Sequence, residues 1–477
     1  MRRTKIVATL GPATESPDVL KNLIAAGLDV VRVNFSHGNP EDHIERVKLV
    51  REIAASCGQE VGVLADLQGP KIRIDKFADG KVCLEEGARF VLDSQCPEES
   101  GDAERVGITY KELPNDVGRG DTMLLDDGNI VLWVDEVNGH EIECRVVVGG
   151  ELSNNKGINR QGGGLSAPAI TDKDRADIKV AAEIDADYVA VSFPRNAADI
   201  HEARELLRNA GGQGDIVAKI ERAESLNGID EIIAATDVVM IARGDLGVEI
   251  GDAELPGVQK NIISMARSMN RVVITATQMM QSMIEHQIPT RAEVFDVANA
   301  VLDGTDAVML SAETATGNYP VKVIEAMDRI CRGAEKQKLA RLSHHRVNTE
   351  FSRIDEAIAM ATMYTANHLG VRAIAALTES GSTTRWMSRI SSGIPIYAMT
   401  KHESTRRKLT LYRGVYPVAF VFSCAKVTGE VNKATIKELV DRESVRDGDL
   451  VIITKGDMAG VHGGTNAMKI VRVGELR

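Results

Sequence analysis

The stretch IVAKIERAESLNGIDEI, residues 216–232, decides the fold of this chain. It starts with a short apolar, β-branched run and continues with a helical pattern. That order is typical of a βα unit in a parallel sheet covered by helices. Lys219 and Glu221 stand two residues apart, so both side chains point to the same face of the strand.

The same alternation of strand-like runs and helical patterns extends over residues 4–311. Eight runs are present, and eight is the strand number of a TIM (β/α)8 barrel. The runs are Ile6–Thr9, Asp29–Phe35, Val61–Leu67, Tyr188–Phe193, Ile216–Ile220, Val238–Ala242, Val272–Thr277 and Ala307–Leu310.

The alternation stops between residues 70 and 168. Asp79-Gly80, Asp127-Gly128 and Asn138-Gly139 separate alternating segments there, and such dipeptides favour β-hairpins. We therefore expect a small all-β domain, a β-barrel lid, inserted after the third strand. A lid over the catalytic face would exclude water from the reaction.

Residues 341–477 predict a third domain. A helix over 353–369 is followed by further strand-like runs, as in an open α/β domain. The predicted fold class is α/β, with a barrel domain over 1–69 and 169–340, the lid over 70–168 and the C-terminal domain over 341–477.

Composition narrows the class of protein. The 477 residues are 43% hydrophobic and 26% charged, as in a soluble globular protein, and no apolar run approaches the length of a membrane helix. The net charge of -12 disfavours nucleic acid as a partner, although the C-terminal domain is basic, with 20 Lys and Arg against 13 Asp and Glu. The six cysteines show no zinc or disulfide spacing, which suits reduced thiols in the cytoplasm.

Polar residues follow six of the eight strands. In a βα barrel the C-terminal strand ends carry the chemistry, so these residues predict one charged pocket. They are Arg32, Asn34, Ser36 and His37; Asp66, Lys71 and Arg73; Lys219 and Glu221; Arg243, Gly244 and Asp245; Thr277 and Gln278; Ser311 and Glu313. Glu221 and Asp245, without a His or Cys cluster, suit a hard cation such as Mg²⁺ or Mn²⁺, which would bridge an anionic substrate.

The chain resembles the pyruvate kinase family over essentially its whole length. The resemblance rests on residues 216–232, on MIARGDLGVEI at 240–250, on ITATQMMQSM at 274–283 and on PTRAEVFDVANAVLDGTDAVMLSAET at 289–314. It implies a bacterial-type enzyme that transfers the phosphoryl group of phosphoenolpyruvate to ADP in glycolysis, giving pyruvate and ATP. It also implies a cytoplasmic homotetramer.

The resemblance further implies roles for single residues. Glu221 and Asp245 would hold the metal, and Lys219 would neutralise charge at the transferring phosphoryl group and the enolate. Arg32, Gly244, Asp245 and Thr277 would contact substrate. Arg73, Lys156, His37 and Asn34 would contact the nucleotide, with an exposed hairpin lysine as the alternative for Lys156. Thr277 and Ser311 would relay a proton to the enolate through a bound water.

Lys71 departs from the pattern of potassium-dependent members. Those members have Glu at this position, with Thr and Lys where this chain has Leu67 and Gln68. The Lys71 ammonium could replace K⁺ and repel it, although Asn34, Ser36 and Asp66 of the family's cation site remain. We expect activity without a monovalent cation.

The string LTESGSTTRW, residues 377–386, follows a strand and opens a helix. Thr378, Ser380, Gly381, Ser382 and Thr383 could take a phosphate there, and in allosteric members this loop binds an activator. An ordinary N-cap turn is the alternative. Ser382 replaces an arginine of some relatives, so the effector is left as a phosphorylated sugar or a nucleoside monophosphate.

Two other functions compete with this hypothesis. A metal-dependent lyase or aldolase on the same barrel would use Glu221 and Asp245, but it leaves Lys219, the lid and the C-terminal domain without a role. If the chain were a sensor of phosphorylated ligands without catalytic activity, we would expect substitutions at Lys219, Glu221 or Asp245. All three residues are intact.

Overall fold

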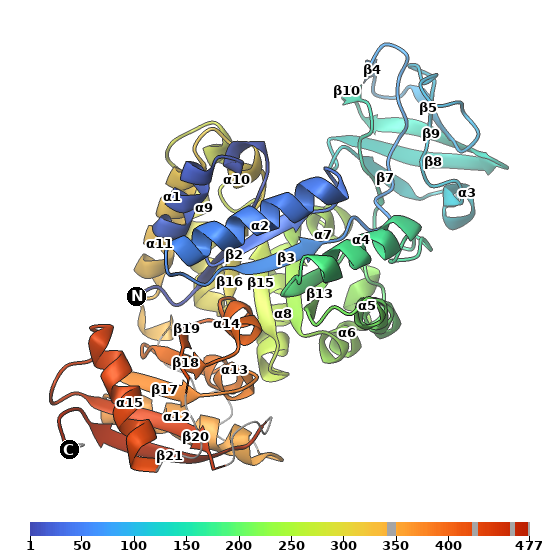
Figure 1. Cartoon of the computed structure of the whole chain (residues 1–477). Coiled ribbons are helices and arrows are strands. Elements are labelled where there is room, and N and C mark those ends of the chain that lie inside the picture. Colours follow the sequence, from blue (N-terminus) through green and yellow to red (C-terminus); the bar gives the residue numbers. More distant parts are fainter. Residues whose placement is uncertain (341–349, 422–427, 458–462, 476–477) are drawn as a thin grey trace.

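The computed structural model describes residues 1–340, 350–421, 428–457 and 463–475. A closed barrel occupies the middle of the molecule, with an all-β domain on one side and an α/β domain on the other (Figure 1). This arrangement confirms the predicted fold class.

The barrel consists of eight parallel strands, and each predicted run matches one of them to within two residues. Most of these strands are buried along their whole length, which explains why they are apolar runs rather than alternating patterns. Around the barrel they are β1 (Lys5–Thr9), β2 (Val30–Asn34), β3 (Gly62–Asp66), β12 (Tyr188–Val191), β13 (Asp215–Ile220), β14 (Val238–Ala242), β15 (Val272–Ala276) and β16 (Ala307–Leu310).

Helices surround the barrel, and several begin at strong N-caps. Thr290 precedes α9, where its hydroxyl accepts from the Glu293 amide while Glu293 accepts from the Thr290 amide. The helices are α1 (Pro17–Ala26), α2 (Pro40–Ser56), α4 (Asp172–Glu183), α5 (Ala197–Asn209), α6 (Ile229–Ala235), α7 (Arg243–Ile250), α8 (Leu255–Ser268), α9 (Arg291–Asp303), α10 (Ala312–Ala315) and α11 (Pro320–Ala334), with short 3-10 turns η1 (Pro12–Thr14), η2 (Glu224–Leu226), η3 (Gln281–Ile284) and η4 (Lys338–Ala340).

The β domain lies between β3 and α4 in the chain. Asp127 and Gly128 both have positive φ at the hairpin between β7 and β8, as the dipeptide predicted. A six-stranded sheet, β11-β7-β8-β9-β5-β6, is accompanied by the pair β10-β4. The elements are β4 (Lys81–Leu84), β5 (Arg89–Asp93), β6 (Arg105–Gly107), α3 (Leu113–Asp116), β7 (Thr122–Leu125), β8 (Ile130–Asn138), β9 (Glu141–Val148), β10 (Gly150–Ser153) and β11 (Ile158–Arg160).

The α/β domain has the sheet order β19-β18-β17-β20-β21, with β21 antiparallel. Strand β19 was not predicted, because Pro417 interrupts its pattern, and its edge position tolerates that proline. Helix α13 begins at Ser382, three residues before the predicted Arg385. The elements are α12 (Ile354–Leu369), β17 (Ala373–Leu377), α13 (Ser382–Ser388), β18 (Ile396–Thr400), α14 (Glu403–Leu409), β19 (Val415–Ala419), α15 (Thr428–Asp441), β20 (Leu450–Gly456) and β21 (Thr465–Arg472).

Five cysteines, at positions 57, 83, 96, 144 and 331, carry free thiols. Cys424 lies outside the described residues. Within the described chain, no helix has the length and apolar character needed to span a membrane.

Candidate active site

A pocket of about 650 Å³ lies at the C-terminal ends of the barrel strands. The structure brings most of the predicted site residues together there. The lining includes Arg32, Asn34, Ser36, His37, Lys71, Arg73, Lys219, Glu221, Asp245, Thr277 and Ser311.

Lys219 is the charged centre of this pocket. Its Nζ lies 3.2 Å from Asp66 Oδ1 and 3.0 Å from Glu221 Oε1, and it donates to Ser192 Oγ at 2.7 Å. Burial lowers the pKa of Lys219, but Asp66 and Glu221 outweigh burial and raise it above its usual value. Lys219 is therefore a fixed cation rather than a proton donor.

Asp66 holds two cations in place from beneath the pocket. It is fully buried, and its Oδ2 accepts from Arg32 Nε at 2.6 Å. Burial favours the neutral acid, yet Lys219 and Arg32 outweigh it and lower the pKa of Asp66. Arg32 also donates to Thr9 Oγ1 at 3.0 Å, so its guanidinium is oriented by two strands.

Glu221 and Asp245 fit a divalent cation. Burial raises the pKa of Glu221, and the charges of Asp245 and Asp66 raise it further, against the opposing effect of Lys219. This mutual repulsion of carboxylates is what a bound divalent cation relieves. One Glu221 oxygen already accepts from the Phe193 amide at 2.9 Å, which fixes the carboxylate.

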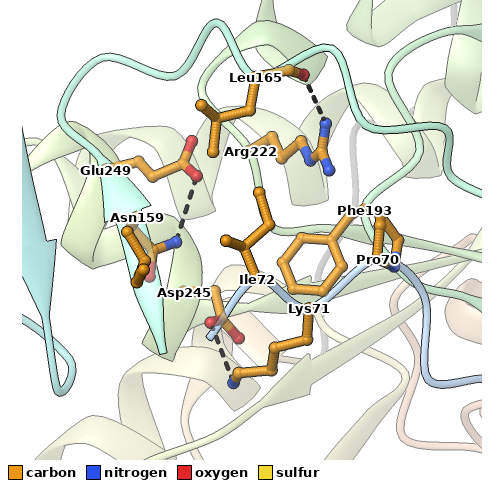
Figure 2. Close-up of a pocket in the computed structure, with 10 residues that line it drawn as sticks. Pro70, Lys71, Ile72, Asn159, Leu165, Phe193, Arg222, Asp245 and Glu249 are labelled. Carbon is orange, nitrogen blue, oxygen red and sulfur yellow. Dashed lines mark hydrogen bonds and ion pairs between the residues drawn. The ribbon is translucent and has the colours of Figure 1, made fainter. Parts of the chain in front are cut away.

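Lys71 reaches Asp245 from the segment that leads into the β domain (Figure 2). The Nζ to Oδ1 distance is 3.5 Å. Farther along the same recess, Asn159 of β11 donates to Glu249 Oε1 at 3.3 Å, and Arg222 donates to the Leu165 carbonyl at 3.1 Å. The β domain is thus attached to the barrel beside the proposed metal ligands.

Thr277 lies in a strained turn. Its φ is 65° and that of Gln278 is 53°, a conformation that is unusual for a β-branched residue. Arg243 holds the turn, donating from Nη2 to the Thr277 carbonyl at 2.7 Å and from Nη1 to Asp296 at 2.7 Å. Thr277 Oγ1 accepts from the Gly244 amide at 2.8 Å and donates to the Ala276 carbonyl at 2.6 Å.

Seven predicted residues do not line the pocket: Asp66, Leu67, Lys156, Arg243, Gly244, Gln278 and Glu313. Leu67 is part of the apolar core, and only its carbonyl reaches the site, accepting from Ser192 Oγ at 2.7 Å. Lys156 is in the β domain, where its Nζ lies 2.7 Å from Asp126 Oδ1. A nucleotide contact from Lys156 stays a prediction.

No residue at the end of the fourth barrel strand was predicted to belong to the site. Ser192 binds Lys219, and Phe193 has a φ of 55° that aims its amide at Glu221. Both residues line the pocket. Their position after a barrel strand was the available signal, but neither side chain is charged.

The predicted effector loop is a tight turn before α13. Gly381 has a φ of 81°, and its amide donates to Thr378 Oγ1 at 2.9 Å. Thr378 and Thr383 are buried, and Thr383 Oγ1 lies 2.7 Å from Thr465 Oγ1. Ser380 is exposed and Ser382 is half-buried, so both residues are at least partly open to solvent.

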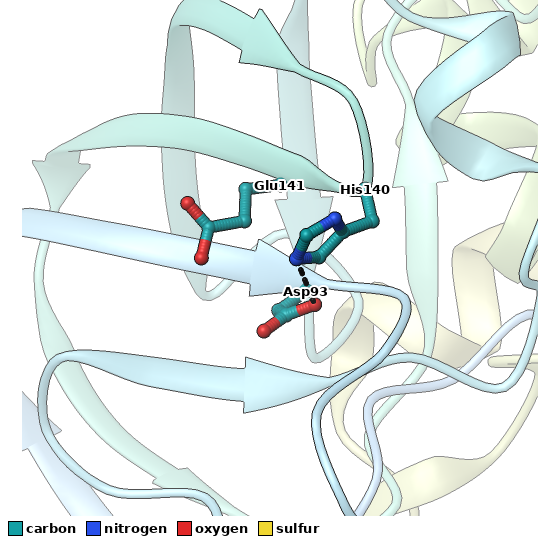
Figure 3. Close-up of side chains that lie close together, drawn as sticks. All are labelled: Asp93, His140 and Glu141. Carbon is teal, nitrogen blue, oxygen red and sulfur yellow. Dashed lines mark ion pairs between the residues drawn. The ribbon is translucent and has the colours of Figure 1, made fainter.

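A second acidic cluster lies in the β domain, formed by Asp93, His140 and Glu141 (Figure 3). Arg105 Nη1 lies 3.2 Å from Asp93 and 2.9 Å from Glu141. Because this guanidinium already neutralises both carboxylates, we assign no metal to the cluster.

A closed βα barrel with a charged pocket at its C-terminal strand ends is the arrangement of a TIM-barrel enzyme. The family description "Pyruvate kinase, barrel domain" matches residues 1–324, and "Pyruvate kinase, alpha/beta domain" matches residues 356–471. The chain is 57% identical to pyruvate kinase II of Salmonella typhimurium over 99% of both chains. It is 54% identical to the pyruvate kinase of Haemophilus influenzae over 96% of both. The chain belongs to the pyruvate kinase family.

Proposed function

We propose that this pocket transfers the phosphoryl group of phosphoenolpyruvate to ADP, with Lys219 at its centre. The observation that carries the proposal is the buried Lys219 ammonium, held by Asp66, Glu221 and Ser192 at the meeting point of the strand ends. Phosphoryl transfer depends on positioning and on neutralisation of oxygen charge, and a fixed cation supplies both. Arg32 would bind the substrate phosphate through its planar fork.

Glu221 and Asp245 would hold Mg²⁺ or Mn²⁺, which supplies positive charge for the phosphoryl and carboxylate oxygens of the substrate. Lys219 favours the ionised form of Glu221, against burial and the neighbouring carboxylates, which together raise its pKa.

The enolate left by the transfer needs a proton on carbon. Thr277 and Ser311 line the same pocket, and a water between them could deliver that proton. The Thr277 hydroxyl is oriented by the Gly244 amide and the Ala276 carbonyl. Thr277 is therefore a residue that positions the water rather than a free acid.

The nucleotide would lie toward the β domain. Arg73, His37 and Asn34 line that side of the pocket, and Arg73 Nη1 donates to the Asn155 carbonyl of the β domain at 2.7 Å. Closure of the β domain as a lid would bring Lys156 toward the phosphates and exclude water. Lys156 would exchange Asp126 for a nucleotide phosphate.

Lys71 would replace a monovalent cation. Its Nζ already lies beside Asp245, where it can neutralise charge near the transferring group. Asn34, Ser36 and Asp66 remain nearby, while Leu67 offers only a backbone carbonyl. K⁺ is therefore not required.

The α/β domain would bind a phosphorylated sugar or a nucleoside monophosphate as activator. The solvent-accessible Ser380 and Ser382 and the basic balance of the domain support this role. We expect the protein to act as a cytoplasmic homotetramer, with no nucleic acid or membrane partner.

Purified protein supplied with phosphoenolpyruvate, ADP and Mg²⁺ should form pyruvate in proportion to enzyme, as a coupled lactate dehydrogenase assay would measure. Release of pyruvate without ATP formation would instead favour a phosphatase or lyase.

A further inference from the structure

A second recess lies where the barrel meets the α/β domain, at the N-terminal end of the barrel strands. It holds about 320 Å³ of empty space, part of which is open to solvent. Apolar side chains form part of its wall, and the polar part comes from three arginines and three serines: Arg3, Arg267, Arg413, Ser388, Ser391 and Ser392. None of these residues belongs to the catalytic pocket or to the loop at 378–383.

Two of these arginines bind only neutral acceptors. Arg267 Nη2 donates to the Arg389 carbonyl at 2.9 Å and to Ser391 Oγ at 3.2 Å. Arg413 Nη1 donates to the carbonyls of Val301 at 3.0 Å and Thr305 at 2.9 Å. Such contacts satisfy N–H groups but do not pair either guanidinium directly with a carboxylate.

The carboxylates near these arginines form ion pairs with other arginines. Asp306 forms a buried ion pair with Arg389, and Glu335 pairs with Arg3. Within the described ranges, neither Arg267 nor Arg413 forms an ion pair with any Asp or Glu. The segments left out, 341–349, 422–427, 458–462 and 476–477, contain no Asp or Glu in their sequence.

The charges around the two guanidiniums differ: positive neighbours prevail at Arg267, whereas Glu335 and Asp306 oppose the effect of burial at Arg413. Burial, together with Arg389 and Arg413, lowers the pKa of Arg267 to about 10. Burial likewise lowers the pKa of Arg413. Arg267 is still charged at neutral pH, and a largely buried charge without an ion-pair partner is destabilising.

We propose that this recess binds a small tetrahedral oxyanion, phosphate or sulfate, between the Arg267 and Arg413 guanidiniums. Planar guanidinium forks match the oxygens of such an ion. The Ser391 hydroxyl accepts from Arg267, and its own proton is free to be donated, because no acceptor for it occurs among the described residues.

The Arg267 side chain is held in place before any ion binds. Gly304 ends α9 with a φ of 99°, and a Cβ at this position would lie 2.3 Å from Arg267 Nη1. The guanidinium therefore packs directly on the glycine backbone, while its partial exposure leaves a route from solvent. A bound oxyanion would join α8 of the barrel to the segment after α13.

Thermal unfolding of the whole protein with inorganic phosphate tests the site. Phosphate at about ten times its Kd should raise the Tm by about 2–4 °C, and Arg267→Gln should lose most of that shift. Without phosphate, Arg267→Gln should be as stable as the wild type or more stable, because it removes a largely buried charge without an ion-pair partner. Phosphate bound in the catalytic pocket affects both proteins equally and cancels in this comparison.

Arg271→Gln is the matched control, since Arg271 also donates to backbone carbonyls but does not line the recess. It should keep the full phosphate shift. Crystals soaked in selenate give a second measurement that needs no variant: anomalous density between Arg267 and Arg413 is expected. Equal phosphate shifts in wild type and Arg267→Gln, or selenate density confined to other sites, would overturn the proposal.

Discussion

Lys71 Nζ lies 3.5 Å from Asp245 Oδ1, so a protein ammonium stands beside a proposed metal ligand. Figure 2 shows that the two side chains approach from different parts of the chain, the segment before the β domain and helix α7. The position of this charge underlies our proposal that the pocket works without K⁺.

Wild-type activity should change by less than about twofold between buffers with and without K⁺, because Lys71 supplies the charge. Lys71→Glu should lose about tenfold or more in kcat without K⁺ and recover part of it when K⁺ is added. Initial rates in tetramethylammonium buffers, with and without KCl, measure both effects. Strong K⁺ stimulation of the wild type would show that Lys71 does not replace the ion.

Glu249 should make stability depend on pH. Burial raises the pKa of this carboxyl from 4.5 to about 7, so the folded state holds the proton more tightly than the unfolded state. The stabilisation of the folded state by this bound proton is fully present below pH 4.5 and is lost as the pH rises to about 7. Between pH 4.5 and about 7, the free energy of unfolding of Glu249→Gln should rise relative to that of the wild type, by about 3 kcal/mol at most. Urea unfolding at a series of pH values measures the difference, and parallel pH profiles would argue against a raised pKa.

Thr277→Ala should lower kcat by about 10²–10³ with a smaller change in the KM for phosphoenolpyruvate, because the hydroxyl acts after substrate binding. Thr277→Ser keeps the hydroxyl and should retain most of the rate. Exchange of the pyruvate methyl protons with solvent, followed by NMR, isolates the protonation step. If both variants exchange equally, the hydroxyl has no part in it.

Arg389→Met should destabilise the interface between the barrel and the α/β domain. Arg389 and Asp306 are each about 1% exposed, and removal of one partner leaves a buried charge, at a cost of about 3–5 kcal/mol. Arg442→Met breaks an exposed i,i+4 pair with Glu438 and should cost about 0–1 kcal/mol. The two unfolding midpoints in urea should differ accordingly, and equal midpoints would contradict this view of Asp306.

Much of the fold was predictable from the sequence because barrel strands are buried on both faces. Runs such as Val238–Ala242 carry no polar residues, and their short length and β-branched composition distinguish them from buried helices. Strand β19 was not predictable in the same way, since Pro417 interrupts the strand pattern of this edge strand.

The pocket was predictable where charge marks a strand end, as at Lys219 and Asp245. It was not predictable where a backbone group, rather than a charged side chain, contributes to the site. The positive φ of Phe193, which turns an amide toward Glu221, has no side-chain signature. Nothing in the sequence marks Glu249, and only its contacts with Asn159 and Ala223 in the folded chain reveal its burial.

The steady-state rate of Lys219→Met tests the central claim most directly. With saturating phosphoenolpyruvate, ADP and Mg²⁺, pyruvate formation should fall by about 10³-fold or more, while the unfolding midpoint shows the variant to be folded. Lys322→Met, which changes an exposed lysine on α11, should keep the wild-type rate. A rate for folded Lys219→Met within tenfold of the wild type would contradict the assignment of Lys219 as the cation at the transferring phosphoryl group.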